Sequence, residues 1–231
     1  MVDASPLGGL DLRRQPSVTD QVFDALYRQI VELQLAPGAK LSEVDVARQM
    51  GVSRQPVRDA FYRLSQQGFL LIRPQRATVV THISVDGVMQ ARFIRTALEL
   101  ETVRAAAVNL TDAAFAALDA LMLRQRQAVA AGDKRLFHAL DDEFHQQICV
   151  LSGHDYAWTL IRESKAHMDR VRYLSLSFGA DSTLDDHDSL LNALKARDGE
   201  KAAAAMRVHL SRIVSIISRL KESHGHYFAS E

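Results

Sequence analysis

All five prolines of this 231-residue chain lie at or before Pro74. The remaining two thirds is rich in alanine, leucine and charged residues at helical spacing, which is typical of amphipathic helices. Because proline interrupts a helix interior, its absence from the later part permits long helices there. The change in composition predicts two domains with a boundary near residue 82.

The overall composition excludes several classes of protein. The 28 Lys and Arg residues balance the 28 Asp and Glu residues, so no global charge indicates a nucleic-acid or membrane partner. Cys149 is the only cysteine, which excludes an intrachain disulfide and a cysteine-based zinc site. No segment resembles a signal peptide or approaches the ~20 apolar residues of a membrane span. The sequence therefore predicts a soluble, cytoplasmic protein with no membrane partner.

Residues 1–16 lack periodicity and are expected to form a flexible arm. Apolar spacing then predicts a helix from Ser17 to the turn at 36–38, a short helix from Ser42 to about Met50, and a third from Ser53 to before Gly68. The runs FLLI and TVVTHI flank RPQRA and predict a hairpin. Residues 17–82 thus form one predicted domain.

The pattern after His82 is helical almost to the end. Short connections between its segments predict an antiparallel bundle over residues 83–222, followed by a C-terminal tail at 223–231. Candidate caps and glycine breaks divide this region into six predicted helices, at 85–109, 111–131, 133–151, 155–176, 182–197 and 199–222.

The second and third predicted helices meet at Gly51, as a helix-turn-helix requires. Residues 41–80 hold six arginines against three acidic residues, which gives this block a local positive charge. We expect the hairpin to project Arg73, Gln75 and Arg76 as a wing that can reach the DNA backbone or minor groove. The alternative is a three-helix packing domain whose arginines are only a solvated face. The candidate DNA contacts at the start of the third helix and in the wing are Ser53, Arg54, Gln55, Arg58 and Arg76.

Polar side chains interrupt three apolar stripes in the predicted bundle. Asp141 and His145 lie one turn apart at the edge of one stripe, while His187 and His209 occupy positions where the periodicity favours leucine. A shared divalent cation would explain three imidazoles and a carboxylate that converge from three helices. The alternative is a set of separately hydrogen-bonded core histidines, and His138 and Asp142 are substitute ligands on the same face.

A family resemblance covers residues 17–82. The run GVSRQPVRDAF, with the Gly68 turn and the TVV strand that follow it, resembles the winged helix-turn-helix of the GntR transcription regulators. This resemblance implies operator contacts for Arg54 and Arg58. Val44 and Ala77 depart from the family pattern, which often has an arginine and a glycine at these positions.

Residues 85–222 resemble the FCD ligand-binding domain of the FadR-type branch of these regulators. The resemblance lies in RFIRTALELETVRAAA, LDDEFHQQICVLSG and DDHDSLLNALKARDGEKAAAAMRVHL. It implies a zinc, nickel or similar divalent ion bound by Asp141, His145, His187 and His209. It also implies a small organic-acid or sugar-acid effector near Arg95, a residue that alternatively anchors its helix to Glu99 or Glu143.

The expected protein is mainly α, with an N-terminal winged helix-turn-helix followed by an FCD-like, all-α antiparallel bundle. We expect a homodimeric transcriptional regulator, a repressor rather than an enzyme, whose affinity for double-stranded operator DNA depends on a carboxylate effector. Two alternatives remain at this stage: a metal that is purely structural, with no effector, and a metal-dependent hydrolase.

Overall fold

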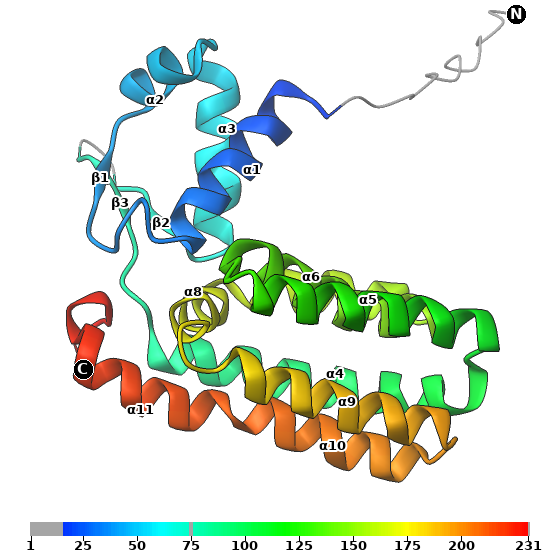
Figure 1. Cartoon of the computed structure of the whole chain (residues 1–231). Coiled ribbons are helices and arrows are strands. Elements are labelled where there is room, and N and C mark those ends of the chain that lie inside the picture. Colours follow the sequence, from blue (N-terminus) through cyan, green and yellow to red (C-terminus); the bar gives the residue numbers. More distant parts are fainter. Residues whose placement is uncertain (1–15, 74–75, 231) are drawn as a thin grey trace, which may run out of the picture.

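A computed structural model of the chain describes residues 16–73 and 76–230. The expected flexible arm, apart from Pro16, lies outside the described residues, as does Gln75 of the expected wing. Figure 1 shows a small N-terminal domain of helices and short strands standing on a larger bundle of helices. The chain is mainly helical, as predicted.

The N-terminal domain contains three helices and a small sheet. The helices are α1 (Val18–Val31), α2 (Glu43–Met50) and α3 (Arg54–Gln66). Strands β2 (Leu70–Leu71) and β3 (Thr78–Val80) pair antiparallel, which confirms the predicted hairpin. A further strand, β1 (Lys40–Leu41), pairs with the other edge of β3 and was not predicted. Two residues are too few to show the alternation by which a strand is recognised in a sequence.

Local side-chain chemistry sets the ends of these helices. Ser17 and Asp20 form a reciprocal capping box at the start of α1, and the Ser42 side chain caps α2. Gly51 follows α2 with φ of 66°, a left-handed conformation that glycine adopts without a Cβ penalty. Ser53 occupies the N-cap position of α3, but its side chain makes no capping hydrogen bond. The first helix ends at Val31, earlier than the predicted turn at 36–38.

The bundle is arranged in two layers (Figure 1). Helices α5 (Asp112–Ala130) and α6 (Lys134–Leu151) form the layer nearer the N-terminal domain. Helices α4 (Val85–Asn109), α9 (Ala180–Lys195) and α10 (Gly199–Ser211) form the layer beneath it. The core between the layers is apolar and includes Leu100, Leu118, Phe137, Phe144 and Leu191.

The prediction of one helix over 155–176 is wrong. The structure has α7 (Asp155–Ser164) and α8 (Ala166–Ser175), separated at Lys165, whose side chain is buried against Asp142 and Asp169. Because the chain changes direction at Lys165, α8 is seen end-on in Figure 1, where it passes between the bundle and the N-terminal domain. Helical spacing alone gives no sign of a break that depends on a tertiary ion pair.

The predicted helix over 199–222 is also divided, at Arg212, into α10 and α11 (Ile213–His224). The helix predicted from residue 182 begins instead at Ala180, so Ser182 lies within its first turn. Arg212 keeps helical dihedral angles and forms an ion pair with Asp186 of α9. The interruption therefore lies beside the polar residues of α9 and α10.

The last residues pack against the connection between the two domains. A short 3₁₀ helix, η1 (Gly225–Tyr227), follows α11, and Phe228 is buried beside Ile83. The Ile83 amide donates to the Tyr227 carbonyl at 2.8 Å, and the Ala229 amide donates to the Ile83 carbonyl at 2.9 Å. This end of the chain therefore holds the start of the bundle in place.

Within residues 16–73 and 76–230, none of the helices combines the length and the apolar character needed to cross a bilayer.

The core of the N-terminal domain yields a stability prediction. Phe61 is completely buried in α3, whereas the side chain of its neighbour Tyr62 is 61% exposed. We expect Phe61→Ala to lower the free energy of unfolding by about 3–5 kcal/mol, because it leaves a cavity among well-packed side chains. Tyr62→Ala is the matched control and should change it by less than about 0.5 kcal/mol. Urea denaturation followed by circular dichroism measures both, and equal effects would contradict the described packing.

Candidate functional site

The four residues predicted as metal ligands come together inside the bundle. Asp141 and His145 lie on α6, His187 on α9 and His209 on α10. One potential ligand atom from each lies within 4.8 Å of those of the other three. Asp141, His145 and His187 are buried, and His209 is half-buried. The cluster has three nitrogen donors and one oxygen donor.

Helix geometry and aromatic packing place these groups. Asp141 and His145 are four residues apart, so both side chains project from the same face of α6. Phe144, between them in sequence, stacks on the His187 ring with centroids 4.2 Å apart. The His145 and His209 rings lie 5.1 Å apart, and the His187 and His209 rings 4.9 Å apart. The same stripe that packs α6 into the core thus carries half of the cluster.

A neighbouring polar group faces the Nδ1 atom of each imidazole. Gln125 Oε1 accepts from His187 Nδ1 at 3.0 Å, and Gln125 Nε2 donates to the Leu140 carbonyl, which fixes the orientation of the amide. Glu99 Oε2 lies 2.5 Å from His145 Nδ1. Asp186 Oδ2 lies 3.5 Å from His209 Nδ1. Such outer partners orient metal-binding histidines and select the tautomer whose Nε2 carries the free lone pair.

The donor set fits a divalent cation. The Nε2 atoms of His145 and His187 are buried and have no hydrogen-bond partner among the described residues. The nearest carboxylate oxygen to His187 Nε2 is Asp141 Oδ1 at 3.4 Å. Buried polar atoms without partners each cost about 1–3 kcal/mol, so two in one cluster indicate a missing ligand. Zinc and nickel both accept such nitrogen and carboxylate ligands.

The protonation states agree with this fit. Burial lowers the pKa of His209 to about 4. Burial, followed by the repulsion of the neighbouring His209 and His145, holds the pKa of His187 well below its usual range. Neutral imidazoles have the lone pairs that metal ligation needs.

Arg172 of α8 lies beside the cluster and was not predicted. Its Nη2 atom contacts Asp141 Oδ2, and its Nη1 atom lies 2.8 Å from Asp142 and 3.0 Å from Asp169. Burial and the nearby Arg95 lower the pKa of Arg172 to about 9. Arginine is common on helix surfaces, so nothing in the spacing distinguished this one.

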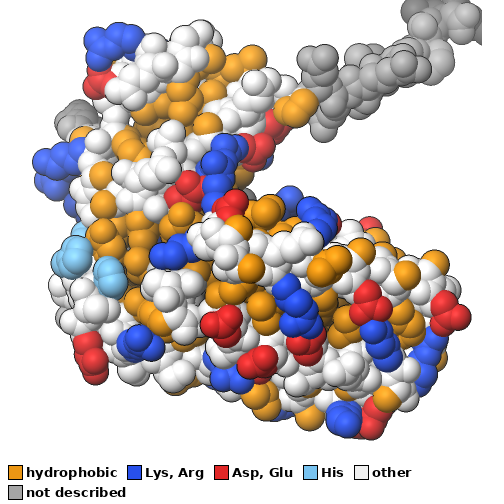
Figure 2. All heavy atoms as spheres, viewed as in Figure 1, with side chains coloured by type: hydrophobic (Ala, Val, Ile, Leu, Met, Phe, Trp, Pro, Cys, Tyr) orange, Lys and Arg blue, Asp and Glu red, His pale blue; other side chains and the backbone are white. Residues whose placement is uncertain are grey.

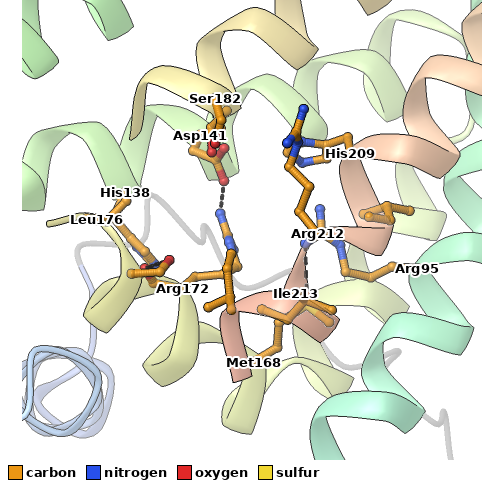
Figure 3. A pocket seen from close by; sticks show the side chains of 14 residues that line it. Arg95, His138, Asp141, Met168, Arg172, Leu176, Ser182, His209, Arg212 and Ile213 are labelled. Carbon is orange, nitrogen blue, oxygen red and sulfur yellow. Dashed lines mark hydrogen bonds and ion pairs between the residues drawn. The ribbon is translucent and has the colours of Figure 1, made fainter. Parts of the chain in front are cut away.

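The cluster opens into a pocket (Figure 3). Asp141 and His209 line it, together with three arginines, Arg95, Arg172 and Arg212. The remaining wall is largely apolar and includes Met168, Leu176, Leu210, Ile213 and Ile216. The pocket therefore offers cations, a potential metal site and apolar surface to one small ligand.

Arg95 is nearly completely buried and is bound to Glu99, with 2.5 Å between Nε and Oε1. Arg95 therefore anchors its helix to Glu99, which was the alternative to effector binding, and it also lines the pocket. Although burial alone raises the pKa of Glu99, Arg95 and His145 hold it well below its usual range. Glu99 thus links the buried arginine to the metal cluster.

The other polar residues of the bundle have different positions. His138 lines the pocket but does not belong to the cluster, and Asp142 pairs with Lys165 at 2.7 Å. His167 is half-buried in α8, and its Nδ1 accepts from the Ser84 amide at 3.3 Å.

The predicted DNA contacts lie at the exposed start of α3 and next to the hairpin turn. Ser53, Arg54, Gln55, Arg58 and Arg76 are all exposed. Arg54 and Arg58 lie 3.7 and 3.3 Å from Glu43 Oε2, and Gln55 Nε2 donates to Asp59 at 2.8 Å. Exposed pairs of this kind are weak and exchange readily with other partners. Figure 2 shows basic side chains at the outer edges of this domain.

Comparison with known proteins supports both halves of this description. Residues 18–80 match the family model of the gntR family of bacterial regulatory proteins, and residues 90–212 match the FCD domain. The chain belongs to the GntR family of regulators and carries an FCD domain. It is therefore a DNA-binding transcriptional regulator, and the hydrolase alternative is wrong.

Relatives of this GntR regulator match over nearly their full length. The HTH-type transcriptional repressor RspR of Escherichia coli K12 is 36% identical over 216 residues, covering 93% of this chain and 95% of the relative. A probable D-xylose utilization operon transcriptional repressor of Paenarthrobacter nicotinovorans is 29% identical to this chain. The match covers 84% of this chain and 86% of that relative. The solved structure of E. coli McbR is 27% identical with a TM-score of 0.77, covering 89% of this chain and 99% of McbR.

Gln125 provides a test of the candidate site that does not remove a ligand. Because its Oε1 fixes the His187 ring, we expect Gln125→Leu to lower zinc affinity about 10- to 100-fold. Competition with a chromogenic chelator measures the dissociation constant. His187→Ala is the positive control and should reduce the zinc content further, while Gln127→Leu on the same helix should leave it unchanged. Wild-type affinity in both Gln125→Leu and His187→Ala would contradict the site.

Proposed function

We propose that this protein is a repressor that binds operator DNA as a homodimer and responds to a small carboxylate near a divalent metal. The observation that carries the proposal is the position of the cluster. Two imidazole nitrogens without partners lie in a group of four donors beside a pocket that three arginines line. A purely apolar core would contain none of these groups.

In the proposed metal centre, one ligand atom comes from each of four residues, Asp141, His145, His187 and His209. A divalent ion bound there supplies positive charge, with coordination positions open to water or an effector oxygen. Glu99 and Gln125 hold the imidazoles of His145 and His187, and Asp186 lies 3.5 Å from His209 Nδ1. Zinc and nickel are the preferred ions for this donor set.

The chemistry of the pocket supports binding of a small carboxylate effector. Arg172 and Arg212 line the pocket and bind carboxylates of the protein itself, Asp141 and Asp186. Guanidinium groups bind carboxylates through two parallel hydrogen bonds, so an organic acid or sugar acid can compete for these partners. The more deeply buried Arg95, bound to Glu99, is better suited to hold the site than to contact the effector.

In the proposed function, α3 recognises double-stranded operator DNA. In the proposed complex, Arg54, Gln55 and Arg58 reach base edges, and Ser53 and Arg76 contact phosphates. Glu43 releases its two arginines when DNA takes its place. Two similar proteins, RspR and the D-xylose regulator, are named as repressors, which supports repression here.

A homodimer is expected because one recognition helix reads only a few base pairs. Helices α4 and α7 pack against each other and both present large apolar side chains to solvent. Phe93 is 72% exposed, Tyr156 68% and Leu160 38%. We assign the dimer contact to this face, since exposed apolar side chains of this size favour burial by a partner.

The recognition helix is tested by charge removal. We expect Arg54→Ala and Arg58→Ala each to weaken binding to DNA sites that the wild-type protein selects from a random library, by about 1–3 kcal/mol. Gel shifts at fixed salt measure the affinity. Arg124→Ala, an exposed arginine of α5 in the bundle, is the matched control. If both α3 variants bound DNA with wild-type affinity, α3 would not be the recognition helix.

The dimer face predicts that Phe93→Glu shifts the protein toward monomer. The side chain is largely exposed in the single chain, so the charge is tolerated there and is buried only by a partner. Sedimentation velocity measures the distribution between the two states. Leu123→Glu, an exposed position on α5, should remain dimeric. A dimer of unchanged stability in Phe93→Glu would exclude this face.

The effector is tested by a thermal-shift screen of organic and sugar acids with zinc-loaded and chelator-treated protein. An acid present at 100 times its dissociation constant should stabilise the folded protein by about 2.7 kcal/mol. The stabilisation should require zinc and should be lost in Arg172→Gln. Melting that depends on zinc, with no response to any acid, would favour the alternative in which the metal is purely structural.

A further inference from the structure

Helix α8 contacts the metal cluster on one side and the winged domain on the other. Arg172 reaches the cluster through Asp141, while Asp169 reaches α1, and its neighbour on α8 reaches the end of β3. The contacts come from positions 169, 170 and 172 of a helix of 10 residues. A change at the metal cluster can therefore reach the N-terminal domain through a few neighbouring side chains of α8.

On the cluster side, Arg172 binds three carboxylates at once. They belong to Asp141, Asp142 and Asp169, and the last two also bind the buried Lys165 at 2.7 Å. Two cations thus share three anions in a region that is largely buried. Electrostatic interactions are stronger there than at the surface, so the loss of one partner redistributes the others.

On the winged-domain side, the Tyr27 hydroxyl of α1 donates to Asp169 Oδ2 at 2.9 Å. The Tyr27 ring packs edge-on against Phe69, at 5.2 Å between centroids, so the side chain is held in place. Asp169 accepts at the same time from Lys165 and Arg172. Its two oxygens are therefore fully used, and a stronger bond to one donor weakens another.

A second contact fixes the end of β3 to α8 through a side chain that makes no hydrogen bond with Asp169. Arg170 donates to the Thr81 carbonyl at 2.5 Å and lies over the Phe69 ring at 5.6 Å. Thr81 directly follows β3. This contact does not involve a residue of the cluster, so it can serve as a pivot while the bond to Tyr27 changes.

We infer that Arg172, Asp169 and Tyr27 form a relay that couples occupancy of the metal pocket to the position of α1. The inference rests on the proposed metal centre. When Asp141 serves as a metal ligand, Arg172 loses one carboxylate and lies beside an added positive charge. It then binds Asp142 and Asp169 more closely, and the hydrogen bond from Tyr27 to Asp169 weakens.

A change at α1 has a direct consequence for DNA binding because α1 packs along α3, the proposed recognition helix. Val22, Phe23, Leu26 and Ile30 of α1 share one core with Phe61 and Leu64 of α3. Close-packed helices move together rather than deform. A shift of α1 relative to α8 therefore shifts α3 relative to the bundle.

Hydrogen–deuterium exchange with and without Zn²⁺ tests the relay and needs neither an operator nor an effector. In the wild-type protein, zinc should slow exchange in α6 and α9, which carry ligands, and should accelerate exchange in α1 about fivefold or more. In Tyr27→Phe, which removes only the hydroxyl, the response of α6 and α9 should persist and that of α1 should disappear. Tyr227→Phe, in η1, is the matched control and should behave as wild type.

A second variant, Arg172→Gln, interrupts the relay at its centre and should also abolish the α1 response while α6 and α9 still respond. The relay is refuted if α6 and α9 respond in the wild type but α1 does not, or if α1 responds equally in Tyr27→Phe. If zinc changes exchange in neither α6 nor α9 of the wild type, the metal centre is refuted and the relay with it.

Discussion

The architecture of this regulator depends on polar groups buried between α6, α8, α9 and α10. Three imidazoles and a carboxylate occupy space that leucine would fill at lower cost in free energy, and each removes a polar atom from water. The bundle compensates by surrounding them with further polar side chains, among them Glu99, Gln125 and Asp186. The interior of the bundle is therefore specified for a ligand as well as for stability.

The need to pair buried charges also explains why two helices of the bundle are interrupted. Lys165 and Arg172 lie close to buried carboxylates, and the chain changes direction at Lys165, so that α8 runs across the end of the bundle. Arg212, at the junction of α10 and α11, plays a corresponding role toward Asp186. In both places the junction of two helices carries an arginine or lysine that pairs with a buried acid.

Much of the candidate site was readable from the sequence because its residues break a regular pattern. His187 and His209 interrupt apolar stripes, and Asp141 and His145 lie one turn apart, so spacing made all four candidates, and the family resemblance implied them as one ligand set. Gln125 gave a comparable signal, since it occupies a buried position of the α5 stripe between Met122 and Ala128. Arg172 gave none, because its partners Asp141, Asp142 and Asp169 come from two helices whose contact the spacing does not encode. The strand β1 was missed for another reason, since its two residues carry no periodicity.

The sequence by itself determined the two-part organisation, the helix caps at Ser17 and Ser42, the left-handed turn at Gly51 and the position of each donor on its own helix. These features depend on composition, on spacing along one helix or on the chemistry of one residue, which are local properties. The tertiary structure alone decided which side chains surround the donors, where α7 and α8 separate, and that Arg95 binds Glu99. It also decided that α8 connects the cluster to α1 through Tyr27. These outcomes depend on which helices meet, and that is settled by the packing of the whole chain.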